Sequence, residues 1–142
     1  MLEKPAFRSS AKKRRCLILA DGYYEWKAEG KAKKPFYFHL RDDRPFAFAG
    51  LWDCWNGEGV PLESCTIITT NANDLSRPIH DRMPVILSPE ACTLWLDREV
   101  EDTRVLQDLL KPYPADAMES YAANPIVNSV KNNQPECLER VA

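Results

Sequence analysis

Short runs of hydrophobic residues alternate with turn residues along most of the chain. The runs are rich in aromatic and β-branched side chains, which favour strands, and Gly, Pro, Asn and Asp residues stand between them. Within residues 46–52, Gly50 indicates a bulge or a close approach of another part of the chain. The pattern predicts strands over residues 16–20, 23–27, 35–40, 46–52, 64–70 and 120–122.

Helical signals gather in the second half of the chain. Ser88 stands before a proline and an acidic residue, as an N-cap residue does, and an apolar stripe follows it. Residues 102–111 form a second segment with one apolar face. Residues 71–84 have the composition of a loop, and residues 3–15 are a polar, basic lead-in with a helical turn around Phe7.

The order of these elements predicts an α+β fold, with a β-rich, curved, barrel-like antiparallel sheet and a few peripheral helices. A length of 142 residues suits one domain, and we expect residues 1–142 to form it. No apolar run reaches the roughly 18 residues of a membrane span. The first four residues contain no apolar signal-peptide region. These features predict a cytoplasmic protein that does not bind membranes.

The cysteines argue against disulfides and metal binding. There are five of them, widely spaced, with no CxxC pair, and the chain has only two histidines. Buried free thiols are therefore the expectation. Glycine-rich phosphate loops and the HExxH and GxSxG motifs are also absent from the sequence. We expect neither a metal ion nor a cofactor.

The net charge of −2 hides an uneven distribution. Residues 1–41 carry 11 Lys and Arg against 4 Asp and Glu, whereas residues 42–142 carry 8 against 17. A basic segment that includes residues 12–15 and the lysines at 31, 33 and 34 could face phosphates. The alternative is an ordinary solvated loop and turn, because lysine-rich turns occur on many protein surfaces.

One carboxylate stands out from the predicted strands. Glu25 lies between Tyr24 and Trp26, directly after an Asp-Gly turn. A carboxylate among aromatic rings loses part of its hydration, which disfavours its charged form and suits it to general acid or base catalysis. The alternative is a strand glutamate that points to solvent or pairs with Lys27.

A histidine in the loop over residues 71–84 is the second candidate for proton transfer. His80 is followed by Asp81 and Arg82 and lies between two prolines. The neighbouring acid could fix the tautomer of the imidazole or favour its charged form. The alternative is a loop histidine that bonds only to the backbone. His39, in an aromatic strand, is expected to pack rather than to react.

Four further residues could contact a nucleic acid. An aromatic ring is either part of the core or a platform on which a base stacks. An arginine binds phosphate or pairs with an acid, and hydroxyls at the end of a strand can line a cleft. These candidates are Trp26, Arg8, Arg82 and Thr69, the last of which is followed by Thr70.

Taken in order, a set of motifs resembles the SOS response-associated peptidase (SRAP) family, the abasic-site shield proteins. The resemblance extends along nearly the whole chain, and the motifs at 20–26 and 79–85 are specific only when taken jointly. The motifs are EKPAFR at 3–8, RCL at 15–17, ADGYYEW at 20–26, FAGLW at 48–52, TTNAN at 69–73, IHDRMPV at 79–85 and VN at 127–128.

The resemblance implies a β-rich fold with a positively charged cleft for single-stranded DNA that contains abasic sites. In the family an N-terminal cysteine attacks the ring-opened sugar aldehyde and forms a thiazolidine cross-link, and it also takes part in removing the leading residue of the chain. The active-site glutamate of the family falls on Glu25, as a proton shuttle, and its histidine falls on His80. The positions that match the DNA path are Arg8, Trp26, Thr69 and Arg82.

The sequence departs from the family pattern at its start. Family members begin Met-Cys-Gly-Arg-Phe, whereas this chain begins with Met1 and Leu2, and none of its cysteines is N-terminal. A thiazolidine needs an amine and a thiol on one residue, so we expect no stable cross-link from the chain as written. We also expect exposed sheet edges, which self-association or a complementing N-terminal segment would cover.

Three hypotheses follow. The first is a protein that binds single-stranded DNA and acts on abasic sites through Glu25 and His80. The second is a module of the same fold that binds DNA without catalysis, through the basic segment and Trp26. The third is a remnant of the fold that needs a partner chain to complete its sheet.

Overall fold

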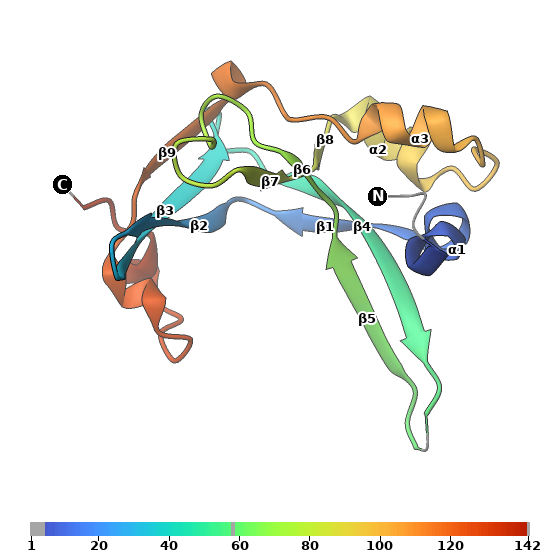
Figure 1. Cartoon of the computed structure of the whole chain (residues 1–142), viewed down its shortest axis with the longest axis horizontal. Helices are drawn as coiled ribbons and strands as arrows, with labels where there is room; N and C mark the ends of the chain where they lie inside the picture. The colour runs from blue at the N-terminus through green and yellow to red at the C-terminus, as the bar shows by residue number, and fades with distance from the viewer. Residues whose placement is uncertain (1–4, 58, 142) are drawn as a thin grey trace. The chain divides into compact units, whose positions relative to one another are not determined.

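The computed structural model describes residues 5–57 and 59–141, and of residues 5–8 and 103 the backbone only. Within these ranges it has three α-helices, nine strands and three short 3-10 helices (Figure 1). The expected β-rich architecture with antiparallel sheets and few helices is confirmed. The sheets are curved and open rather than closed into a barrel.

The chain divides into two compact units. Unit 1 comprises Met1–Leu19, Phe46–Thr70 and Pro84–Tyr113, and unit 2 comprises Ala20–Pro45, Asn71–Met83 and Pro114–Ala142. Each unit is built around its own sheet. That residues 1–142 act as one domain stays a prediction.

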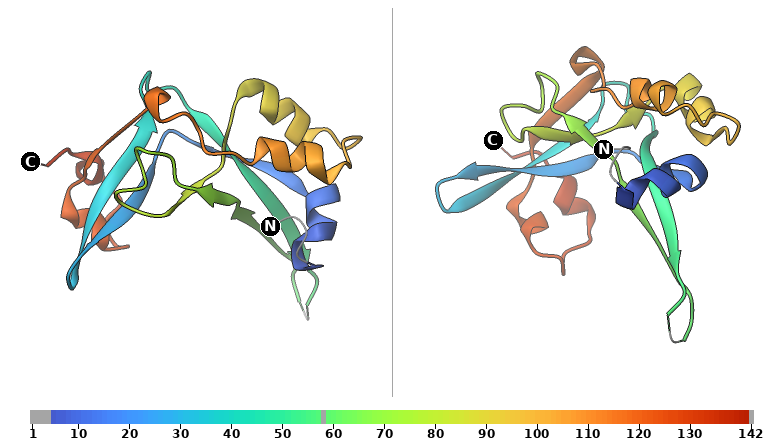
Figure 2. Two further views of the ribbon diagram at one scale, coloured as in Figure 1. Left: turned by 45° about the horizontal axis from the view of Figure 1, so that its top comes forward. Right: turned by 45° about the vertical axis from the view of Figure 1, so that its right-hand side comes forward.

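Unit 1 contains a sheet of order β1-β4-β5, to which β8 adds by pairing with β4. Its core contains fully buried side chains such as Trp95, Leu106 and Val85. The hairpin of β4 and β5 extends beyond α1 in every view (Figures 1 and 2). The elements are α1 (Pro5–Lys13), β1 (Arg15–Ala20), β4 (Phe46–Trp55), β5 (Leu62–Ile67), β8 (Ile86–Leu87), α2 (Pro89–Leu96) and α3 (Thr103–Leu109).

The basic lead-in is a nine-residue helix rather than a single turn. Arg15 explains part of the difference, because it is buried and ties α1 to α2. Its guanidinium donates to Ala11 O at 2.7 Å and Lys12 O at 2.9 Å, at the end of α1. It also donates to the backbone oxygens of Trp95 and Asp97, at the end of α2. The expectation that Arg15 faces phosphate or solvent is therefore wrong.

Gly50 confirms the expected close approach. A Cβ at this position would lie 2.4 Å from Ile18 Cδ1 and 2.9 Å from Cys16 Sγ. Gly50 sits in β4, and both of these side chains belong to β1, the neighbouring strand. Glycine is needed here because the β1 side chains occupy the volume of a methyl group.

Unit 2 contains a three-stranded antiparallel sheet of order β2-β3-β9. These strands are β2 (Tyr23–Glu29), β3 (Ala32–Leu40) and β9 (Met118–Ala122). Residues 71–84, expected to be a loop, also contain strand β7 (Arg82–Pro84), which pairs with β6 (Thr69–Asn71). The 3-10 helices span Ala115–Ala117, Pro125–Asn128 and Pro135–Leu138.

All five cysteines are free thiols, but they are not uniformly buried. Cys137 is buried, Cys65 is exposed, and the other three lie between these extremes. The expectation of buried thiols is thus wrong for Cys65, which lies on β5, a strand exposed along its whole length. None of the described helices is long and apolar enough to cross a membrane.

Candidate functional site

Glu25 lies in the middle of β2, on one face of the unit 2 sheet. Side chains alternate along a strand, so Glu25 shares its face with Tyr23 and Lys27. In the antiparallel register Tyr23 pairs with Phe38 and Glu25 pairs with Phe36, which places these rings beside the carboxylate. The rings of Tyr23 and Phe38 are stacked, with centroids 5.0 Å apart.

The surroundings of Glu25 combine apolar walls with partial access to solvent. Its side chain is half-buried. Burial, and then the charge of Glu25, raises the pKa of the Tyr23 phenol, which shows that the carboxylate and this phenol interact. No salt bridge within 4.0 Å joins Glu25 to Lys27 among the residues that the structure describes. The simpler interpretation of Glu25 as the ion-pair partner of Lys27 therefore loses support.

Two lysines stand directly opposite each other on this same face. Lys27 of β2 pairs in register with Lys34 of β3, next to the pair of Glu25 and Phe36. Like charges directly across a strand pair are destabilising. The Lys34 ammonium also lies 5.9 Å from the centre of the Phe36 ring. This arrangement suits an anionic ligand that would run past Glu25.

The segment over residues 71–83 is folded tightly around two buried polar residues. Asn73 accepts bonds at its Oδ1 from the backbone N–H and the hydroxyl of Ser76, both at 3.0 Å. The backbone N–H of Asn73 also lies 3.4 Å from the sulfur of the fully buried Met83. His80 continues this structure, because its N–H donates to Ser76 O at 2.9 Å. The loop composition seen in the sequence thus corresponds to a well-packed turn.

This segment rests on the face of the sheet that carries Glu25. The side-chain amide of Asn73 lies 3.5 Å from the sulfur of Met118 in β9. Met118 pairs with Leu40, which lies on the same face of β3 as Phe38 and Phe36. Glu25 and the segment that contains His80 therefore share one face of the unit 2 sheet, although 55 positions separate the two residues in the sequence.

The ring of His80 is held through its Nδ1 atom. Nδ1 lies 3.1 Å from the backbone nitrogen of Arg82, as an acceptor, and 3.2 Å from the backbone oxygen of Arg82, as a donor, and the tautomer decides which of the two bonds forms. Nδ1 also lies 3.3 Å from an oxygen of Asp81, which can accept the second proton of the imidazolium. His80 is 44% exposed. All of these contacts engage Nδ1, so Nε2 is the ring nitrogen that a ligand could approach.

The remaining candidates are placed differently. The guanidinium of Arg82 donates to Asn71 Oδ1 at 3.1 Å. Thr69 is half-buried and begins β6 in unit 1. The side chain of Arg8 lies outside the described part of the structure.

Trp26 lies on the other face of the unit 2 sheet from Glu25. Its indole N–H donates to Asn128 Oδ1 at 2.7 Å, and its ring centroid is 6.2 Å from that of Tyr24. Adjacent residues on a strand point to opposite faces, so one strand supplies a candidate proton shuttle to one face and a candidate base platform to the other.

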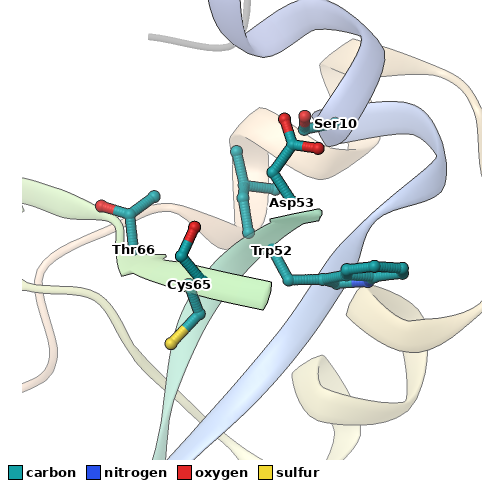
Figure 3. A pocket seen from close by; sticks show the side chains of 7 residues that line it. Ser10, Trp52, Asp53, Cys65 and Thr66 are labelled. Atoms are coloured by element: carbon teal, nitrogen blue, oxygen red, sulfur yellow. The ribbon is translucent and has the colours of Figure 1, made fainter. Parts of the chain in front are cut away.

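A small hollow of about 130 Å³ lies in unit 1, between α1 and the β4–β5 hairpin. Figure 3 shows Asp53 directed toward Ser10 of α1, with Trp52 directed away from them. The Asp53 carboxylate lies 3.4 Å from the guanidinium of Arg14. The hollow is below the size of typical ligand pockets.

Comparisons with known proteins decide the family. The sequence model of the SOS response associated peptidase (SRAP) family matches residues 1–130. The chain belongs to the SRAP family. Among curated relatives, the abasic site processing protein YoqW of Bacillus subtilis is 51% identical over 139 residues, which cover 96% of this chain and 62% of YoqW. The abasic site processing protein HMCES of Gallus gallus is 36% identical, with 97% of this chain and 47% of HMCES covered.

A solved structure supports the same fold for this SRAP chain. A protein from Bacteroides thetaiotaomicron superposes with a TM-score of 0.88 at 34% identity, covering 99% of this chain and 62% of that one. The SRAP chain thus spans about three-fifths of the length of YoqW and of this structural neighbour, and about half the length of HMCES.

Sequence reasoning missed the residues that build the site's supporting segment. Asn73 and Ser76 were given no role, yet they organise the turn on which His80 stands. The signal available was an Asn followed three residues later by a Ser, since asparagine side chains commonly accept bonds from nearby backbone N–H groups in turns.

Proposed function

We propose that this SRAP-family protein binds single-stranded DNA at abasic sites and that Glu25 and His80 move protons on the opened sugar. The observation that supports this most directly is the shared face of Glu25 and the His80 segment, flanked by Lys27 and Lys34. The names of YoqW and HMCES, abasic site processing proteins, point to the same substrate.

The two groups suit two steps of the chemistry. When an amine condenses with the sugar aldehyde, the carbinolamine must lose water, and Glu25 can protonate the leaving hydroxyl. His80 can protonate the ring oxygen while the anomeric hydroxyl gives up its proton to water, which breaks the ring C–O bond and opens the sugar to the aldehyde. Proton transfer by positioned side chains contributes about 10²- to 10⁴-fold to a rate. Arg82 and the two lysines would hold the phosphates of the strand.

The Trp26 face of the unit 2 sheet extends the proposed DNA path. Trp26 offers a ring for stacking, and its bond to Asn128 fixes the orientation of that ring. Thr69 and Arg8 stay predictions of DNA contacts. If the protein binds DNA without any chemistry on the sugar, the second hypothesis of a binding module is the correct one.

Binding is tested with fluorescently labelled single strands, with and without a stable abasic analogue, over a series of salt concentrations. Lys34→Gln should weaken binding and reduce the slope of log K against log salt by about 0.7, the value for one lost phosphate contact on a single strand. Lys111→Gln, an exposed lysine of unit 1 that pairs with Asp108, is the matched control and should bind as the unmodified protein does.

Chemistry is tested with a true abasic site, by following covalent adducts and strand cleavage on denaturing gels. Glu25→Gln should lower the rate at which adducts or cleaved strands appear by about 100-fold or more. It should leave the affinity for the abasic strand unchanged. Glu29→Gln is the control, because Glu29 lies on the same strand and face but is exposed beside the turn. Equal rates for Glu25→Gln and the unmodified protein would show that Glu25 is not the shuttle. Failure of every strand to bind would overturn the whole proposal.

Exposed apolar side chains also favour a contact with further polypeptide. On the β4–β5 hairpin of unit 1, Trp55 is 66% exposed, Leu62 is 60% exposed, and Trp52 and Ile67 are also exposed. We propose that either a second copy of this chain or a complementing segment, such as the additional length of the relatives provides, covers them. Light scattering of the unmodified protein and of Trp55→Ser checks this. A monomer whose solubility Trp55→Ser leaves unchanged would contradict the contact with a second copy.

A further inference from the structure

The face of the unit 2 sheet opposite Glu25 contains a pocket that the proposed chemistry does not use. Its volume is about 420 Å³, within the range of small-molecule sites. One wall comes from the turn before β2 and from the aromatic side chains of β2 and β3. The other comes from the C-terminal segment, over residues 127–138.

Two tyrosine rings form the aromatic wall. The rings of Tyr24 and Tyr37 have centroids 5.1 Å apart. The Tyr24 hydroxyl donates to Cys137 O at 3.1 Å, which fixes this ring against the C-terminal segment. Gly22 makes room for Tyr37, because a Cβ at Gly22 would lie 2.1 Å from the Tyr37 hydroxyl oxygen. The wall is therefore built and ordered before any ligand arrives.

The pocket lining has one charged side chain, the Asp21 carboxylate, beside the amides of Asn132, Asn133 and Gln134. Asp21 lines the pocket and is exposed, so its carboxylate is available to a ligand. Asn132 donates one of its two side-chain N–H groups to Ile126 O at 2.6 Å, and its carbonyl oxygen stays available as an acceptor. A flat ligand that presents N–H donors to the Asp21 carboxylate would suit this lining, with Tyr24 as the more accessible ring because Tyr37 is buried.

We propose that this pocket binds an unpaired guanine base of the DNA strand, with Asp21 accepting its N1–H and N2–H groups. Guanine presents two neighbouring N–H donor groups on its Watson–Crick edge, N1–H and N2–H, whereas each of the other bases has a single donor group there. Unpaired bases are commonly recognised by stacking on aromatic side chains and by bonds to this edge. The inference rests on the proposed function, because it assumes that single-stranded DNA is the ligand.

The position of the pocket connects it to the proposed DNA path. Tyr24 adjoins Trp26 on the same face, so a base on the indole and a base in the pocket can be neighbours along one strand. Lys33 lies on this face as well, opposite Ala28 in the register, and its backbone oxygen accepts from Asn128. Lys33, the ring of Trp26 and the pocket beside Tyr24 therefore follow one another along this face.

The test uses thymine-only strands that contain one abasic analogue and a single guanine at each position in turn. At one position guanine should strengthen binding by roughly tenfold over adenine, the scale of one good bidentate contact. Replacing that guanine by hypoxanthine, which lacks the N2 amino group, should remove most of the gain. Because this change is made in the DNA, the outcome does not depend on the folding of a variant.

A protein variant supplies the second arm. Asp21→Asn should abolish the guanine preference while the thymine-only strand binds as before. Asp116→Asn, an exposed aspartate of the same unit, is the control and should keep the preference. If thymine-only abasic strands bind but no position distinguishes guanine from hypoxanthine, the pocket assignment is wrong and the proposed function stands. If no strand binds at all, the proposed function fails first.

Discussion

Replacing Arg15 tests whether one buried cation holds the ends of two helices of unit 1. Its guanidinium donates to backbone oxygens of Ala11 and Lys12 in α1 and of Trp95 and Asp97 at the end of α2. Carbonyls at a helix end have no partner within the helix, and a cation there also complements the helix dipole. Arg15→Met removes every one of these bonds and leaves the side-chain volume nearly unchanged.

The magnitude follows from the number and character of the bonds. A hydrogen bond from a charged donor contributes about 1.5–3 kcal/mol, but bonds that share one donor group are not additive. We therefore expect Arg15→Met to lower the free energy of unfolding by about 3–5 kcal/mol, because it leaves several carbonyl groups at the two helix ends without a donor. Arg15→Lys should cost about 2 kcal/mol, since an ammonium cannot reproduce the planar fork. Burial lowers the pKa of Arg15, and Asp97 and Glu101 partly oppose this effect.

Urea unfolding followed by circular dichroism measures these changes. A loss of about 4 kcal/mol corresponds to a fall in Tm of roughly 10 °C for a chain of this size. Arg14→Met is the matched control, because Arg14 is partly exposed and bonds to Ser10 Oγ and Asp53. It should cost less than about 1 kcal/mol, as for other exposed pairs. If Arg14→Met and Arg15→Met were equally destabilising, the inference that Arg15 holds the helix ends would be wrong.

Three further predictions concern packing, pH and capping. Gly50→Ala should cost about 1–3 kcal/mol by overpacking, and Ile18→Val in the same protein should restore part of this, as a double-mutant cycle in urea would show. Burial, and then Asp21, raises the pKa of Tyr37 to about 12. The phenol of the unfolded chain ionises near pH 10. The contribution of Tyr37 to the free energy of unfolding is therefore fully present below about pH 10 and is lost as the pH rises toward 12. Tyr37→Phe should make the free energy of unfolding, measured in urea at each pH, fall less steeply over this range. Ser88→Ala should cost about 1 kcal/mol, because it removes the N-cap bond of α2, and thermal unfolding checks it.

Local signals explain which elements could be predicted from the sequence. The cap at Ser88 depends on bonds within four residues, and the structure confirms that its side chain accepts from Ala91 N. The strands followed from the aromatic and β-branched runs for the same reason. The full length of α1 could not be predicted, because Arg15 links its last turn to Trp95 and Asp97, about 80 residues away along the chain.

The site shows the same division between local and distant information. The motif around Glu25 was visible in the sequence, and the period of two along a strand already implied that Trp26 points to the opposite face. The sequence did not show that Glu25 and the segment that contains His80 share a face of the sheet, because this depends on the contact of Asn73 with Met118. That contact joins two segments 45 positions apart, and no periodicity reports it.

One pair of residues that destabilises the unit 2 sheet would also favour an anionic ligand. Lys27 and Lys34 repel each other across β2 and β3, at a cost of about 0.2–1 kcal/mol. Local rules of this kind are broken in natural proteins mainly at functional sites. A phosphate between the two ammonium groups would replace their repulsion with two attractions. A bound DNA strand should therefore stabilise unit 2 by more than its contacts with neutral groups alone would. Added salt should weaken that gain while relieving the repulsion in the free protein, because both effects are screened within about 10 Å at 0.1 M.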